Sequence, residues 1–353
     1  LSFLPLSHTL ERTVGYYVPI CIDGSAQVVY ARSIKELGED LLSQKPSIIV
    51  SVPRIFERVF AKVEESLPPG SPKRKLFDKT VEIGWRRFTK QSTLTDRLLW
   101  PLLNAIVAKK LRARLGGKIE YIFLGGAALA PHLLKAFTGV GLTFIHGYGL
   151  TETAPVLAAN RIADNDPMSV GHPLPEVEIK LGEGNELIIR GPIVMKGYWN
   201  RPEATAEVLD KDGWFRTGDV VEIREGRIYI RGRVKDIIVL SNGEKVPPGD
   251  AEQAILQDGV FEQVMVIGEG RPYLMLLAVS ALQNEKQLCE RANAHLKGFP
   301  GYARIRHVLR VSEPWTVENG LLTPTLKLKR SEIEAQYKNE IEALYKRPEP
   351  CGP

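Results

Sequence analysis

A strand, a glycine-rich turn, a helix and a second strand follow one another near the middle of this chain. Residues 120–124 form an apolar run that ends at the Gly-Gly-Ala-Ala turn 125–128, Pro131 begins a helical stretch, and residues 142–145 form the next apolar run. Neighbouring parallel strands need such a crossover connection, which is usually a helix. The order therefore predicts a βαβ unit, and with it an α/β domain built on a parallel sheet.

Both predicted strands end in segments that suit a ligand, because ligands of open parallel sheets bind beyond the carboxyl ends of the strands. The second strand leads into His146, Gly147, Tyr148, Gly149, Leu150, Thr151, Glu152 and Thr153. An aromatic ring can cover a nucleotide base, hydroxyls and amides can hold phosphate oxygens, and a carboxylate can hold Mg²⁺. The segment therefore favours an ATP site, although Gly-Tyr-Gly also occurs in ordinary turns.

Composition excludes several classes of protein. The 353 residues are 44% apolar and 25% charged, and their net charge of +5 comes from interspersed charges. This balance argues against nucleic-acid binding but suits anionic substrates. The three cysteines lie far apart, so neither a disulfide framework nor a zinc site is predicted. No apolar run reaches the ~20 residues of a membrane span, no signal-peptide pattern is found, and a cytoplasmic location is expected.

The pattern of apolar runs along the sequence changes near residue 176. Before it, apolar runs such as 47–52 alternate with helical stretches such as 54–67 and 71–115, and breaks are predicted near Ser92 and Pro101. After it, paired apolar runs predict antiparallel hairpins. These pairs are 177–181 with 186–190, 220–224 with 227–231, and 264–267 with 274–279.

Four further stretches carry side chains that can do chemistry. Asp219 ends a glycine turn, where a carboxylate can accept both hydroxyls of a ribose. Arg233 and Lys235 lie in a charged stretch, Lys327 in a basic one, and His8 near the start. Each stretch also has an ordinary interpretation. Asp219 can belong to a plain turn, and Arg233 and Lys235 to a solvated charge cluster. Lys327 can lie in a basic surface loop, and His8 can be a structural histidine.

Taken together and in this order, the stretches resemble the adenylate-forming superfamily of acyl-CoA synthetases, luciferases and peptide-synthetase adenylation domains. The resemblance covers nearly the whole chain, and the ordered combination is specific although each motif alone is weak. The chain is most similar to the long-chain fatty acid–CoA ligases. That branch is suggested by Pro-Leu-Ser-His at 5–8, Ser-Val-Pro-Arg-Ile-Phe-Glu-Arg at 51–58 and Leu-Leu-Thr-Pro-Thr-Leu-Lys at 321–327.

The resemblance implies a role for each matching residue of the first part of the chain. The residues around the adenine and its loop would be Gly126, Ala127, Ala128, His146, Gly147, Tyr148 and Gly149. Tyr148 would stack on the base, Thr151 would contact the α-phosphate and Glu152 would hold Mg²⁺. His8 would gate the passage between the acyl pocket and the CoA channel.

Roles are implied for the later residues as well. Asp219 and Arg233 would hold the ribose hydroxyls of ATP or AMP, and Lys235 would be the hinge between domains. Lys327 would be the catalytic lysine, because an arginine three residues further on matches the family spacing. Gly243 lies in a loop that would approach the pantetheine arm of CoA.

The implied fold is α/β. Residues 1–233 would be the C-terminal part of a large AMP-binding domain, with a parallel βαβ sheet and a small antiparallel β module at about 170–233. Residues 234–353 would form a small, mobile α+β C-terminal domain. The family's phosphate loop is not found before the His8 motif, and the chain begins within an apolar stretch. We therefore expect an amino-terminally truncated chain that is inactive alone.

The implied activity is the activation of a long-chain fatty acid by ATP to acyl-AMP, with release of pyrophosphate, followed by transfer to CoA. Positive charge is needed because the carboxylate must approach an anionic α-phosphate. Two alternatives stay open: a ligase that passes the acyl group to a carrier protein, and a non-catalytic nucleotide- or acyl-binding module. Peripheral association with a membrane also stays open, since the products are apolar.

Overall fold

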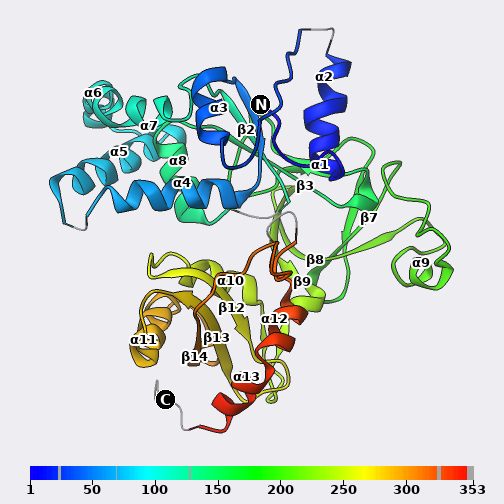
Figure 1. The fold of residues 1–353 in the computed structure, drawn as a ribbon. Helices are drawn as coiled ribbons and strands as arrows, with labels where there is room; N and C mark the ends of the chain where they lie inside the picture. The colour runs from blue at the N-terminus through cyan, green and yellow to red at the C-terminus, as the bar shows by residue number, and fades with distance from the viewer. Residues whose placement is uncertain (23–24, 69, 127–128, 324–326, 348–353) are drawn as a thin grey trace. The chain divides into compact units, whose positions relative to one another are not determined.

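The computed structural model describes residues 1–22, 25–68, 70–126, 129–323 and 327–347 (Figure 1). The chain divides into two compact units. The first comprises Leu1–Gly182, Leu187–Thr217 and Glu222–Ile230, and the second comprises Glu183–Glu186, Gly218–Val221 and Arg231–Pro353. The predicted domain boundary after residue 233 and the hinge at Lys235 stay predictions.

A five-stranded sheet organises the first unit (Figure 1). Its order is β1 (Ile48–Ser51), β2 (Tyr121–Leu124), β3 (Phe144–Gly149), β4 (Val156–Ala159) and β5 (His172–Pro173). The first three strands are parallel to one another, and β3, β4 and β5 are antiparallel. The predicted βαβ unit is confirmed as β2, α8 (Pro131–Gly139) and β3.

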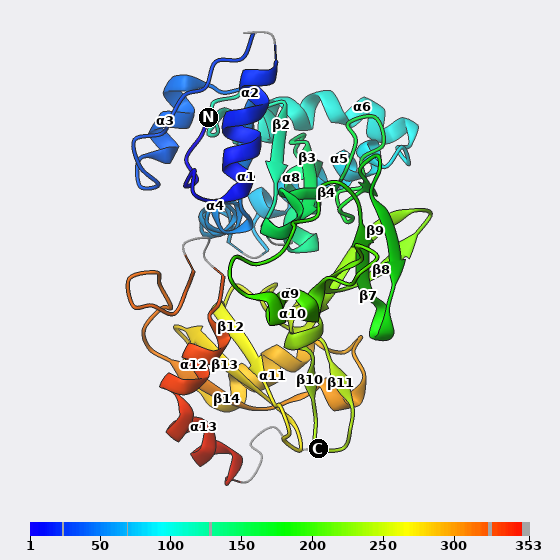
Figure 2. The same ribbon diagram turned by 90° about the vertical axis from the view of Figure 1, so that its right-hand side faces the viewer.

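Most helices of the first unit lie around this sheet, whereas α9 (Pro202–Val208) lies apart from it (Figures 1 and 2). The described helices of this unit are α1 (Thr9–Glu11), α2 (Val18–Cys21), α3 (Leu37–Gln44), α4 (Pro53–Glu65), α5 (Pro72–Phe88), α6 (Leu94–Leu103), α7 (Lys109–Ala113), α8 and α9, with π-helical turns at Arg12–Tyr17 and Asn104–Ala108. Phe56, Phe137 and Phe144 join α4, α8 and β3 in the core, with ring centroids 4.9–6.0 Å apart. A Cβ on Gly84 of α5 would lie 1.7 Å from the Gly139 carbonyl oxygen, so glycine permits the close approach of α5 and α8.

One of the two predicted helix breaks is confirmed and the other is wrong. The chain leaves helix after α5 and re-enters it at Thr93, whose hydroxyl and Asp96 form a reciprocal cap. Pro101, however, lies inside α6. A proline there removes one backbone hydrogen bond, but Pro101 is exposed, so water can satisfy the carbonyl left without a partner.

A three-stranded sheet organises the second unit. It contains β12 (Phe261–Ile267), β13 (Leu274–Ser280) and β14 (Ile305–Val311), with β12/β13 antiparallel, as predicted, and β13/β14 parallel. The helices α10 (Pro248–Ile255) and α11 (Glu285–His295) share a core with one face, and α12 (Arg330–Gln336) and α13 (Lys338–Tyr345) share a core with the other. Both faces are therefore covered, which explains why residues 274–279 of β13 are all apolar.

Two further sheets complete the described structure. A four-stranded sheet has the order β6 (Glu178–Leu181), β7 (Glu186–Arg190), β8 (Phe215–Arg224) and β9 (Arg227–Arg233). A short hairpin joins β10 (Ile238–Val239) to β11 (Lys245–Val246). The predicted α/β class, with a parallel sheet, an antiparallel β module and an α+β unit, is confirmed.

Candidate functional site

The turn that follows β3 is held rigidly by hydrogen bonds. The Leu150 amide donates to the hydroxyl of Thr153 at 2.8 Å, and that hydroxyl donates to the Pro155 carbonyl at 2.5 Å. A Cβ on Gly149 would lie only 1.7 Å from the same carbonyl oxygen, so only glycine fits there. Thr153 is buried and shapes the turn, whereas Thr151 is exposed at its start.

The predicted aromatic and histidine side chains lie on β3 itself. Tyr148 pairs with Ala158 of β4 and is half-buried, while His146 is buried. Burial lowers the pKa of His146 to about 4, so the imidazole is neutral near neutral pH. Within the part of the chain that the structure describes, its Nε2 atom has no hydrogen-bond partner.

Glu152 is positioned by a residue that the sequence analysis did not select. The Tyr198 hydroxyl donates to Glu152 Oε1 at 2.8 Å, and the Met195 amide donates to the Glu152 carbonyl at 2.8 Å. Partial burial and this hydrogen bond raise the pKa of Tyr198 to about 12, so the phenol stays protonated. Tyr198 therefore holds the carboxylate predicted to bind Mg²⁺.

A single carboxylate is compatible with the predicted metal. Among the described residues, no group of three or more His, Cys, Asp and Glu side chains could hold a metal ion. Mg²⁺ is usually bound by one or two carboxylates together with substrate phosphates rather than by a cage of protein ligands. Glu152, half-buried and oriented by Tyr198, fits that pattern.

The His8 segment lies against the glycine turn that ends β2. A Cβ on Gly125 would lie 3.0 Å from the Leu10 side chain, and Gly126 has a positive φ of 84°. His8 Nδ1 accepts a hydrogen bond from the Leu10 amide at 3.3 Å and so caps α1. Ala127 and Ala128, predicted to lie along the adenine, fall outside the described residues.

The second unit brings together three predicted residues from distant segments. Arg233 Nε donates to Asp219 Oδ1 at 2.9 Å, and Asp219 is only 5% exposed. Lys327 lies within electrostatic range of both. Desolvation and the positive charge of Arg233 lower the pKa of Lys327, while the Asp219 carboxylate acts in the opposite direction. This cluster of one carboxylate and two cations suits a polar anionic ligand.

An ion pair that the sequence analysis missed anchors the Lys327 segment. Arg330 Nη2 lies 2.6 Å from both carboxylate oxygens of Glu252, a residue of α10. The Glu252 carboxylate also accepts a hydrogen bond from the Val266 amide at 2.7 Å. The backbone amide of Lys327 itself donates a hydrogen bond to Thr323 Oγ1 at 3.0 Å. The start of α12 is therefore fixed to α10 and β12 immediately after the lysine.

The two remaining predicted residues lie at turns. Lys235 is exposed within the 3₁₀ turn Val234–Asp236. Gly243 lies between β10 and β11 with a positive φ of 85°, a backbone conformation that favours glycine. Their roles stay predictions.

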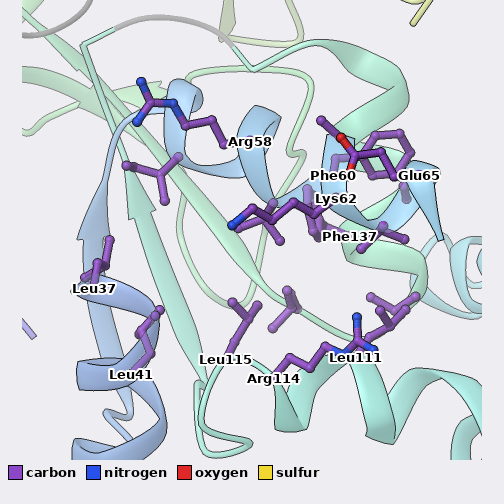
Figure 3. Close-up of a pocket in the computed structure, with 18 of the residues that line it drawn as sticks. Leu37, Leu41, Arg58, Phe60, Lys62, Glu65, Leu111, Arg114, Leu115 and Phe137 are labelled. Atoms are coloured by element: carbon purple, nitrogen blue, oxygen red, sulfur yellow. The ribbon is translucent and has the colours of Figure 1, made fainter. Parts of the chain in front are cut away.

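A separate apolar cavity of about 630 Å³ lies among the helices of the first unit (Figure 3). Leu37, Leu41, Leu111, Leu115 and Phe137 are among the residues that line it, and Arg58, Lys62 and Arg114 also border it. None of the described residues predicted for the nucleotide site lines this cavity. No local sequence pattern predicts it, because its walls come from separate helices.

Comparison with known proteins relates both units to one family. Residues 1–199 match the family model described as AMP-binding enzyme, and residues 235–349 match the AMP-binding enzyme C-terminal domain. Among solved structures, the chain is similar to the A domain of carboxylic acid reductase from Segniliparus rugosus, in complex with AMP and a co-purified carboxylic acid. That match has a TM-score of 0.77 and 26% sequence identity, and covers 98% of this chain and 54% of the other.

Two curated relatives cover nearly the whole chain. The long-chain-fatty-acid–[acyl-carrier-protein] ligase AEE15 of Arabidopsis thaliana is 31% identical, covering 98% of this chain and 55% of its own length. The long-chain-fatty-acid–CoA ligase FadD15 of Mycobacterium tuberculosis is 30% identical, covering 98% of this chain and 62% of its own length. The chain thus spans little more than half the length of these relatives.

Proposed function

Since this chain belongs to the AMP-binding enzyme family, we propose that its protein activates a long-chain fatty acid with ATP. In the first half-reaction the carboxylate attacks the α-phosphorus, which gives acyl-AMP and releases pyrophosphate. In the second, the thiol of CoA attacks the acyl carbon, the thioester forms and AMP leaves. The observation that carries the proposal is the cluster of Asp219, Arg233 and Lys327, three residues from separate segments that match the family's motifs.

The electrostatics of the first half-reaction explain why these residue types are needed. A carboxylate and a phosphate repel each other, so positive charge placed at both lowers the barrier. We assign that charge to Lys327, a compact ammonium. Asp219 would accept the ribose hydroxyls, and Arg233 would orient Asp219 through their ion pair.

The first unit would hold the base and the metal. Tyr148 would stack on the adenine, Thr151 would contact the α-phosphate and Glu152 would bind Mg²⁺, with Tyr198 fixing the carboxylate. Mg²⁺, when bound, neutralises phosphate oxygens. We further propose that His8 gates the acyl pocket, that Lys235 is the hinge and that Gly243 lies near the pantetheine arm.

A carrier protein is the second candidate for the acyl acceptor. It is favoured by one observation, the similarity to a relative whose name specifies an acyl-carrier-protein ligase. Because both acceptors present the same thiol-bearing arm, the first half-reaction is identical for the two.

The experiment that tests the proposal measures pyrophosphate release by the protein at its natural length. Fatty acids of graded chain length are supplied with CoA, with acyl carrier protein or with no acceptor. We expect release with long-chain acids and thioester formation with CoA. Thioester on the carrier protein alone would favour the second candidate, and no release with any acid would contradict both. The same assay on residues 1–353 tests the expectation that this chain is inactive alone.

A further inference from the structure

The helical segment α6–α7 exposes a row of large apolar side chains. Leu94, Leu98, Leu102 and Ile106 are 77%, 81%, 58% and 41% exposed, and they recur every four residues. Residues with this spacing lie on one side of a helix. Figures 1 and 2 show α6 at the edge of the first unit. A solvent-facing helix side is normally polar, so a contiguous apolar row indicates an interaction surface.

The apolar row is not required for packing within the described structure. Leu103 and Ala108 of the same segment are buried, and Trp100, Val107 and Leu111 pack against the core of the first unit. The helix therefore has a second, inward apolar side that already attaches it to the protein. The exposed row takes no part in that attachment.

Cations accompany the apolar row. Between residues 97 and 118 the sequence contains six bases, namely Arg97, Lys109, Lys110, Arg112, Arg114 and Lys118, and no acid. Asp96, at the start of the segment, is buried and lies 2.6 Å from Arg86. Arg97 lies beside Leu98, and Lys109 and Lys110 follow Ile106 by one helical turn; all three are exposed. The surface is therefore apolar along its centre and positively charged at its margins.

We propose that Leu94, Leu98, Leu102 and Ile106, with Arg97, Lys109 and Lys110, form a docking surface for a lipid bilayer with anionic headgroups. Helices that combine exposed leucines with flanking Lys and Arg lie in the bilayer interface, with the apolar side inserted and the cations at the phosphates. Among the described residues, no helix is long and apolar enough to span a bilayer. The proposal therefore concerns binding at the membrane surface only.

The apolar row distinguishes a bilayer from a nucleic acid as the partner. Phosphate contacts with nucleic acid use cations and gain nothing from four exposed aliphatic side chains. Insertion of those side chains between lipids removes them from water. The inference is independent of the proposed reaction, although long-chain fatty acids also partition into bilayers.

Vesicle flotation tests the proposal on the protein at its natural length. Vesicles of phosphatidylcholine alone are compared with vesicles that also contain phosphatidylglycerol. The variants are Leu94→Ser with Leu98→Ser, and Lys109→Gln with Lys110→Gln. The matched control is Leu42→Ser with Leu181→Ser, which removes leucines that are 50% and 45% exposed elsewhere in the first unit.

We expect the wild type and the control to float with the anionic vesicles. The leucine pair should lower the partition coefficient on the order of tenfold or more, and the lysine pair several-fold, with a larger effect at low salt. Unchanged thermal melting of each variant shows that its fold is intact, as expected for exposed positions.

Three results would overturn the proposal. The first is wild-type protein that does not bind the anionic vesicles, and the second is a leucine-pair variant that binds them as the wild type does. The third is a self-association of the protein, detected by light scattering, that the leucine pair abolishes while vesicle binding is unchanged. Binding to heparin that is independent of the leucines, without vesicle binding, would assign the cations to a polyanion instead.

Discussion

Lys327 is the residue whose charge matters most to the proposed first half-reaction. Its pKa is lowered by desolvation and by Arg233, and Asp219 opposes the shift. The electrostatic field at the Lys327 ammonium is therefore set partly by Arg233 and Asp219, two residues that are remote from it in sequence. Arg330 and Glu252 fix the backbone that follows it.

We expect Lys327→Ala to lower the rate of acyl-AMP formation by roughly 10²–10³-fold, the usual effect of removing one preorganised charge. Thioester formation from supplied acyl-AMP should change little, because the proposal gives the lysine no part in that step. The two half-reactions are measured separately, with Lys329→Ala as the matched control. Equal losses in both half-reactions would count against this role.

We expect the buried His146 to make the free energy of unfolding depend on pH. Its folded-state pKa is about 4, below the ordinary value of 6.5. Between these values the unfolded chain binds the proton more readily than the folded one, so the free energy of unfolding falls as pH decreases through this window. The loss is about 3 kcal/mol when the pH reaches the folded-state pKa.

Denaturant unfolding at about pH 7 and about pH 5 measures this dependence. His146→Gln removes the titrating group, so the variant should lose less stability than the wild type between the two pH values. An identical pH dependence in both proteins would show that other groups are responsible.

At the scale of the element, the β3–β4 turn depends on one glycine. Gly149→Ala would place a methyl group 1.7 Å from the Pro155 carbonyl oxygen. We expect the free energy of unfolding to fall by about 1–3 kcal/mol and the KM for ATP to rise. In Gly147→Ala, the matched control on the same strand, the nearest atom is 3.9 Å away. Equal stability of the two variants would contradict the close approach of β3 to Pro155.

The turn Val234–Asp236 carries the proposed hinge residue. Lys235→Pro fixes the φ angle of residue 235 and restricts the backbone conformation of Val234. We expect it to slow thioester formation while acyl-AMP formation is retained, and Lys235→Ala to change neither much. Normal CoA transfer by the proline variant would rule against the hinge.

Elements with a local signal could be predicted from the sequence, and contacts between distant segments could not. Turn residues and apolar runs located β2, α8 and β3. The break predicted at Pro101 did not occur, because an exposed helix position tolerates the loss of one backbone hydrogen bond. Motif resemblance selected Asp219, Arg233 and Lys327, but their proximity required the fold. Tyr198 and Glu252 were missed because their partners lie 46 and 78 residues away.

At the scale of the molecule, the predicted functions are divided between two compact units. The first holds Tyr148 and Glu152, and the second holds Asp219, Arg233 and Lys327. Residues 1–199 match the AMP-binding enzyme model and residues 235–349 match its C-terminal domain, while Asp219 and Arg233 lie between the two matches. The proposed reaction would therefore use residues of both units.

The nucleotide product distinguishes the proposed adenylate-forming reaction from other uses of ATP. Protein at its natural length is incubated with ATP, Mg²⁺, a long-chain fatty acid and CoA, and the nucleotides and thioester are quantified by chromatography. We expect AMP, pyrophosphate and acyl-CoA in equal amounts. Formation of ADP and phosphate, or thioester formation without consumption of ATP to AMP, would contradict the proposed function.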